Sequence, residues 1–395
     1  MSALDRYLTV DATLPADADR ATLVGRVWLP GDPPGPAVVS VRPDGVFDLT
    51  PIVPTMSELC ASPDPVALAR SANAARIGDL APILANSRWD RRDPRTPWLL
   101  APVDLQAIKA AGVTFARSML ERVVEEQANG EPSAAAAIRA RVEELVGAEL
   151  GSVVPGSAAA MRLKEHLVAR GAWSQYLEVG IGPDAEIFTK AQPMSAVGHG
   201  SEIGVLPASR WNNPEPELVL AVAPDGRIVG ATLGNDVNLR DVEGRSALLL
   251  GKAKDNNASC ALGPLIRLLE RGFGLDELRS AEIRLSIHGE DGFALDAAFS
   301  MREISRDLTE LVSHALGPHH AYPDGLVLMC GTMFAPVADR DDQGMGFTHR
   351  WGDVVAIGGA QFGTLANRVA DCAQTPRWEF GAGALMRNLA ERRLL

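Results

Sequence analysis

The chain has 395 residues, 46% of them hydrophobic and 22% charged, and a formal net charge of -12. These values exclude a disordered chain, and no run reaches the roughly 18 apolar residues that a membrane-spanning helix needs. The negative charge disfavours a nucleic-acid partner. Since the first twenty residues lack the basic start and apolar stretch of a leader peptide, we expect a cytoplasmic protein.

The chain is long enough for two domains. Residues 1–105 alternate short apolar runs with Pro and Gly, and the "PDG" in "VSVRPDGVFD" is a turn signal. We therefore predict a small N-terminal β-rich or mixed domain over 1–105 and a larger domain over 106–395.

Helical spacing of apolar residues occurs in "GVTFARSMLERVVEEQ" and again over 133–148. From about residue 177 the pattern changes to short apolar runs separated by Gly and Pro, which predict strands. These runs are "LEVGIG", "AEIFTKAQ", "ELVLAV", "RIVGATLG", "EIRLSIHG", "GLVLMCGT" and "DVVAIGG". Two further helices are predicted over 258–272 and 302–316. The sequence thus predicts a mixed, β-rich α+β fold.

Three carboxylates are expected to meet on one predicted hairpin. Glu215 and Glu217 are two residues apart in "PEPELVLAV", so their side chains share one face of a strand. The turn in "APDGRIVG" would lay the next strand antiparallel to the first and return Asp236 toward this pair. The alternative is a solvated edge strand, where charged residues are common.

The surroundings of the three acids favour a metal site over that alternative. Oxygen ligands suit a hard cation such as Mg2+ or Mn2+. Zinc is disfavoured because the seven histidines show no HxxxH or HExxH spacing. The run "GNDVNLRD" adds Arg240, and "GKAKD" supplies Lys252 and Lys254.

The order "PEPELVLAV…GATLGNDVNLRD…LLLGKAKD…GP" resembles the fumarylacetoacetate hydrolase family. The runs "EIFTKAQPMSAVGHGSEI", "YPDGLVLMCGT" and "WGDVVAIGGAQFGTLANRV" add to the resemblance. It implies a β-roll catalytic domain behind the N-terminal domain, and a homodimer or larger homo-oligomer. It also implies metal binding by Glu215, Glu217 and Asp236, and substrate binding around them. The residues implied to line the site are Lys190, Arg240, Lys252 and Thr332.

Within this family, the reaction depends on the groups beside the metal. The family's carbon-carbon hydrolases use a His and Glu pair to activate water, whereas "GVTFARSMLERVVEEQ" contains Ser118 and Glu121 but no histidine. The same run resembles the dehydratases of 2-keto-3-deoxy sugar acids. We therefore expect a dehydratase that converts a 2-keto-3-deoxy-pentonate, such as the D-xylonate derivative, to 2,5-dioxopentanoate. The alternative is a hydrolase or decarboxylase of acylpyruvate-like diketo acids.

The predicted roles follow from that reaction. Lys252 is predicted to be the base that takes a proton from the substrate, because a nearby cation can depress the pKa of a lysine. Glu121 is predicted to be the acid, with a solvated helix face as its alternative. Ser118 and Glu243 are predicted to contact the substrate, with Glu243 near its hydroxyl groups.

Overall fold

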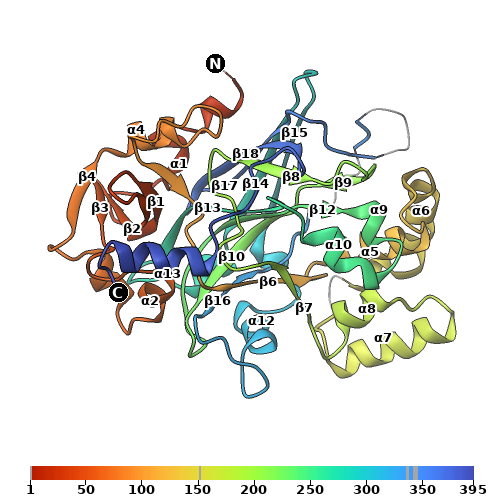
Figure 1. The fold of residues 1–395 in the computed structure, drawn as a ribbon. Coiled ribbons are helices and arrows are strands. Elements are labelled where there is room, and N and C mark those ends of the chain that lie inside the picture. Colours follow the sequence, from red (N-terminus) through yellow and green to blue (C-terminus); the bar gives the residue numbers. More distant parts are fainter. Residues whose placement is uncertain (1, 151–152, 335–337, 341–345) are drawn as a thin grey trace.

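The computed structural model of the protein describes residues 2–150, 153–334, 338–340 and 346–395. Within these residues the largest sheet has eleven strands, in the order β4-β3-β2-β1-β13-β11-β10-β16-β6-β7, with β5 paired to β1 (Figure 1). Its strands are β1 (Leu23–Leu29), β2 (Gly35–Arg42), β3 (Gly45–Asp48), β4 (Ala75–Gly78), β5 (Trp98–Leu100), β6 (Ala107–Gly112), β7 (Glu186–Ala191), β10 (Pro216–Val222), β11 (Ile228–Asp236), β13 (Cys260–Leu268) and β16 (Leu326–Met329).

A second sheet of five described strands follows the order β15-β14-β17-β18-β8, and β9 pairs with β12 apart from both sheets. The strands are β8 (Glu202–Val205), β9 (Asn212–Asn213), β12 (Asn238–Leu239), β14 (Glu282–His288), β15 (Ala294–Ser300), β17 (Val354–Gly359) and β18 (Gly363–Asp371). In β14 the buried Ile283 and Leu285 alternate with the exposed Glu282 and Arg284. The second sheet therefore turns one face to the core and the other to solvent.

Helices cover the sheets at several places. Those of the described residues are α1 (Val10–Thr13), α2 (Met56–Ala61), α3 (Pro65–Ala69), α4 (Leu80–Asn86), α5 (Ala116–Gln127), α6 (Pro132–Leu150), α7 (Ala158–Ala169), α8 (Gln175–Ile181), α9 (Arg240–Glu243), α10 (Leu250–Lys254), α11 (Leu275–Arg279), α12 (Leu308–Ala315) and α13 (Ala382–Glu391). Figure 1 shows α5 to α10 gathered on the right, opposite β1 to β4. We call α5 to α8 the helical cover.

The central hairpin of β10 and β11 lies between two cores, as its alternating side chains require. Leu218 and Leu220 face the second sheet in one cluster, whereas Val219 and Ala221 pack in another with residues of β1, α2 and β6. Glu217 shares the face of Val219, because successive residues of a strand point to opposite sides. The carboxylates therefore lie on the face turned away from the second sheet.

Two predicted elements are wrong in type. Over residues 258–272 a helix was predicted, but the structure has the strand β13 at Cys260–Leu268. A strand was predicted for "LEVGIG", but most of this run lies in the helix α8. Pro264, in the middle of β13, has no backbone N–H and is unfavourable within a helix. A short apolar run without clear alternation fits either a buried strand or a helix.

The predicted mixed, β-rich fold class is confirmed. β1 pairs with β13, so residues 1–105 contribute strands to the same sheet as the central hairpin. The predicted boundary near residue 105 thus falls within one shared sheet, and the division into two domains stays a prediction. None of the described helices is long and apolar enough to cross a membrane.

Candidate metal centre

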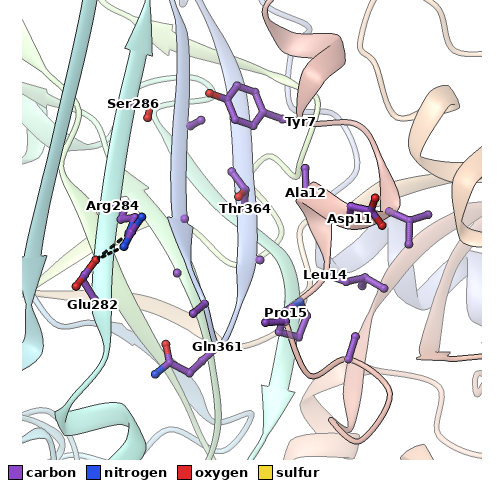
Figure 2. Close-up of a pocket in the computed structure, with 18 of the residues that line it drawn as sticks. Tyr7, Asp11, Ala12, Leu14, Pro15, Glu282, Arg284, Ser286, Gln361 and Thr364 are labelled. Carbon is purple, nitrogen blue, oxygen red and sulfur yellow. Dashed lines mark hydrogen bonds and ion pairs between the residues drawn. The ribbon is translucent and has the colours of Figure 1, made fainter.

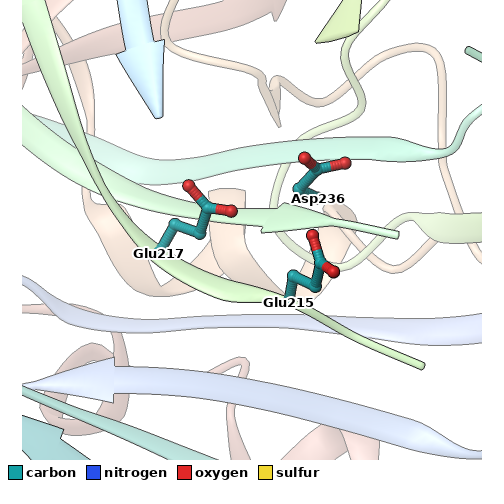
Figure 3. A group of neighbouring side chains, drawn as sticks. All are labelled: Glu215, Glu217 and Asp236. Atoms are coloured by element: carbon teal, nitrogen blue, oxygen red, sulfur yellow. The ribbon is translucent and has the colours of Figure 1, made fainter. Parts of the chain in front are cut away.

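The three acids of the central hairpin come together as the alternation predicts. One oxygen from each of Glu215, Glu217 and Asp236 lies within 4.8 Å of the others, and all three side chains are buried (Figure 3). The amide of Asp236 donates to the carbonyl of Glu215 at 3.0 Å, which joins the hairpin ends. The geometry suits three oxygen ligands for one cation.

A backbone amide holds the carboxylate of Glu217 in place. The amide of Gly331 donates to Oε2 of Glu217 at 2.6 Å. Gly331 has a φ of +87°, and a Cβ there would lie 2.1 Å from Oγ1 of Thr114. Glycine is therefore required for this close approach.

Two lysines contact the trio, and one of them differs from the prediction. Lys190 is fully buried, and its Nζ lies 2.8 Å from Oδ1 of Asp236. Nζ of Lys254 lies 2.5 Å from Oε2 of Glu215 and 3.2 Å from Oδ2 of Asp236. Lys252 is exposed, so its predicted place among the carboxylates is wrong. Two residues along α10 correspond to about 200° of rotation, which puts Lys252 and Lys254 on opposite sides.

The helical cover adds Arg122, which the sequence analysis did not select. Its guanidinium pairs with Glu215 and lies 2.6 Å from Glu125 and 2.8 Å from Glu243. It thereby joins α5 to a carboxylate of the trio and to α9. Glu243, predicted to contact substrate, is buried beside it.

Arg240 and Glu121 extend the same network. Arg240 lies 3.1 Å from Glu121 and 2.7 Å from Glu125, and its guanidinium stacks over Trp211 at 4.1 Å. Arg139 of α6 contacts both oxygens of Glu121, at 2.5 and 2.8 Å. The predicted acid is therefore held between two guanidinium groups.

Ser118 and Thr332 bond to backbone groups close to them in the chain. Oγ of Ser118 donates to the carbonyl of Phe115 at 3.0 Å, and Oγ1 of Thr332 accepts from the amide of Phe334 at 3.1 Å. Ser118 precedes Arg122 by one helical turn, and Thr332 follows Gly331. Both are buried next to network residues, and their contact with substrate stays a prediction.

Two carboxyl groups of the trio have pKa values that are shifted in opposite directions. Burial, together with Asp236 and Glu215, raises the pKa of Glu217 well above its ordinary value. Burial acts in the same direction on Asp236, but the ammonium groups of Lys190 and Lys254 hold the pKa of Asp236 below its ordinary value. Two carboxylates with opposite pKa shifts are typical of functional sites.

Glu186 is a further candidate that the sequence analysis missed. It starts β7, two residues before Phe188, so these two side chains share one face of the strand, and a register irregularity follows at Lys190. Burial, and then Glu243, raise its pKa to about 7, and Lys254 is among the charges that act on it. The available signal was its place at the start of the predicted strand "AEIFTKAQ", which also contains Lys190.

The ion pairs described above link five carboxyl groups with five cations. The carboxyl groups are Glu121, Glu125, Glu215, Asp236 and Glu243, and the cations are Arg122, Arg139, Lys190, Arg240 and Lys254. Buried charge is costly unless it is compensated. Glu217 lies beside this balanced set with a raised pKa, and one oxygen from each member of the trio lies within 4.8 Å of the others, so the oxygen donor set fits Mg2+ or Mn2+.

A cavity elsewhere shows a different character. Its volume is about 860 Å3, and it lies between the N-terminal segment and the second sheet (Figure 2). Its wall includes the ion pair of Glu282 with Arg284, the side chain of Asp11, and mostly small or apolar residues. It contains none of the trio or its lysines, so the candidate site lies at the carboxylates.

The fold and the site together define one class of protein. Its members have a mixed sheet with a buried carboxylate trio at the end of the central hairpin. The chain belongs to the fumarylacetoacetate hydrolase family, because the model of the fumarylacetoacetate (FAA) hydrolase C-terminal region matches residues 162–370. This match covers the trio, both lysines and Glu186.

Two curated relatives are each 34% identical to the chain. One, from Haloferax volcanii, is named "Probable 2-keto-3-deoxyxylonate dehydratase" and aligns over 194 residues, 49% of this chain and 63% of the relative. The other, from Saccharolobus solfataricus, is named "2-dehydro-3-deoxy-D-arabinonate dehydratase" and aligns over 158 residues, 39% of this chain and 51% of the relative. The chain thus spans between half and two thirds of these relatives.

Solved structures support the fold. The structure of 2-keto-3-deoxy-D-arabinonate dehydratase complexed with magnesium and 2,5-dioxopentanoate has a TM-score of 0.61 at 21% identity, and covers 88% of this chain and 99% of its own. Fumarylacetoacetate hydrolase from Exiguobacterium antarcticum has a TM-score of 0.54 at 15% identity, and covers 89% and 100%. At these identities the likeness shows the fold.

Proposed function

We propose that the protein is a Mg2+- or Mn2+-dependent dehydratase of a 2-keto-3-deoxy-pentonate, with the D-xylonate derivative as the first choice. The product would be 2,5-dioxopentanoate. The observation that carries the proposal is the buried trio with Lys254 against two of its members. The names of the two curated relatives support this substrate class.

The metal ligands in this proposal are Glu215, Glu217 and Asp236. When bound, the cation stabilises the negative charge that develops on a 2-oxo acid as its C3 proton leaves. The remaining groups of the site hold the substrate and move its protons.

Lys254 takes the role that the sequence predicted for Lys252, the removal of a proton from C3. Burial acts to lower its pKa, but Asp236 and Glu215 raise it above the ordinary value. Glu215 and Asp236 would hold the cation, which would draw off part of their negative charge, and Lys254 would then be a stronger candidate for the base.

Glu186 is better placed than Glu121 to protonate the departing C4 hydroxyl. Its pKa of about 7 lets it carry a proton near neutral pH, as an efficient general acid must. Both oxygens of Glu121 accept from guanidinium groups. Loss of the C3 proton and the C4 hydroxyl as water leaves a C3=C4 double bond; its shift to C4=C5 gives an enol at C5, which tautomerises to the aldehyde, while the C2 carbonyl remains, so the product is 2,5-dioxopentanoate.

The direct test is product analysis with the purified chain, Mg2+, and a panel of 2-keto-3-deoxy-pentonates and acylpyruvates. We expect 2,5-dioxopentanoate from a pentonate, and its loss with EDTA or in Glu217→Gln. Pyruvate or carbon dioxide from an acylpyruvate, without dehydration of any pentonate, would instead establish the alternative hydrolase or decarboxylase. Cytoplasmic location and assembly as a homodimer or larger homo-oligomer stay predictions.

A further inference from the structure

Arg122 joins three carboxylates from three parts of the chain. It contacts Glu125 on its own helix α5, Glu243 on α9, and Glu215 immediately before β10. Its side chain is 12% exposed, and the guanidinium fork can serve several oxygens at once. One arginine of the helical cover therefore shares a carboxylate with the proposed metal site.

A cation ligated by Glu215 competes for that carboxylate with the two cations that contact it, Lys254 and Arg122. Both carboxylates that contact Lys254, Glu215 and Asp236, belong to the trio. Arg122, in contrast, retains Glu125 and Glu243 if its contact with Glu215 weakens. Release of Glu215 therefore costs less for Arg122 than for Lys254.

We propose that Arg122 is a positioning residue that competes with the divalent cation for Glu215 and so couples the helical cover to the metal site. The inference rests on the proposed metal site and not on the dehydration itself. α5 is tied to α8 by the hydrogen bond from Oγ of Ser174 to Glu126 at 2.5 Å. A change at Arg122 is thus transmitted to the rest of the cover.

The test is the affinity of the full chain for Mn2+ without substrate. Calorimetry and the electron paramagnetic resonance signal of free Mn2+ both measure this affinity. Arg122→Gln removes one competing positive charge, so we expect Mn2+ to bind at least about threefold more tightly than in the unmodified protein. Arg122→Lys keeps the charge but loses the fork, so its affinity should lie between the two. Lys164→Gln, whose lysine pairs with Glu178 on the cover, is the matched control and should leave the affinity unchanged.

A purely structural role for Arg122 predicts weaker Mn2+ binding in its variants, because the site would lose order. Equal or weaker binding in Arg122→Gln therefore overturns the inference. Circular dichroism and melting check that each variant folds; if Arg122→Gln does not, Arg122→Lys against the unmodified protein decides. Absence of Mn2+ binding in the unmodified protein would refute the metal site itself, which separates the two failures.

Discussion

Two buried groups of charges in this protein differ in how they are balanced. At the start of β17, Asp353 accepts from Arg340 at 2.6 and 2.8 Å, from the amide of Arg350 at 3.0 Å, and contacts His349 at 3.3 Å. At the end of the central hairpin, three carboxylates crowd together within 4.8 Å. The first group surrounds one anion with donors, and the second sets carboxyl groups against one another.

The pKa shifts follow this difference. Burial acts to raise the pKa of Asp353, but His349 and Arg340 hold it below the ordinary value of 3.8. Burial and neighbouring carboxylates raise the pKa of Glu217. Removal of one partner from a buried ion pair destabilises a fold, whereas crowded carboxyl groups with shifted pKa values are candidates for a functional site.

The largest expected effect separates two lysines of α10. Lys254→Gln should lower kcat by roughly 100-fold to 10000-fold, the usual contribution of a general base. Lys252→Gln, whose side chain is exposed, is the matched control and should stay within about twofold of the unmodified protein. Steady-state kinetics at saturating Mg2+ measure both. An equal loss in the two variants would contradict the assignment of Lys254.

A substitution in the Asp353 group should lower the stability of the fold and leave metal binding intact. Asp353→Asn leaves Arg340 without its main buried partner, so the free energy of unfolding should fall by about 3–5 kcal/mol. The depressed pKa makes the contribution of Asp353 present above its ordinary value of 3.8 and lost as pH falls. Urea melts at pH 7 and pH 3 measure both effects. Lost Mg2+ affinity in the folded variant would break the distinction between the two groups.

Added metal should stabilise the protein through the carboxylate trio and not through the Asp353 group. At about one hundred times its Kd, Mg2+ should raise the free energy of unfolding by about 2.7 kcal/mol. Glu217→Gln should abolish this gain, and Asp353→Asn should keep it on its lower baseline. Thermal melts with and without Mg2+ decide, and a gain that survives in Glu217→Gln would count against the trio as ligands.

The smallest effect concerns the pH dependence that Glu186 imposes. Its acid form is the active one in the proposed reaction, so kcat should fall about tenfold per pH unit above its pKa of about 7. The raised pKa also gives stability below the ordinary value of 4.5 that is lost as pH rises through about 7. Glu186→Gln should remove both dependences. A kcat that falls in the same way in this variant would assign the limb to another group.

The carboxylate trio could be predicted from the sequence because two local rules determine it. Alternation places Glu215 and Glu217 on one face of a strand, and the hairpin turn sets the register that returns Asp236. Both rules act over about twenty residues. The proposed metal ligands were therefore accessible to reasoning from a single chain.

The prediction of Lys254 and Glu186 required information that such local rules do not contain. The choice between Lys252 and Lys254 depends on the rotation of α10 about its axis, which packing sets. Glu186 reaches the site because β7 pairs with β6 at the far edge of the sheet, a pairing between distant segments. The apolar run of β13 fitted either element type, and its place between β1 and β11 decided the outcome.

The pairing of β1 with β13 has a consequence for dissection of the protein. Cys260 of β13 stands opposite Asp236, and further along the same strand Arg267 stands opposite Leu23 of β1. Removal of residues 1–105 would expose the edge of β13 that pairs with β1, on the strand beside Asp236, and exposed strand edges promote aggregation. The first hundred residues cover one edge of β13, so we expect that a stable fragment of the protein must retain them.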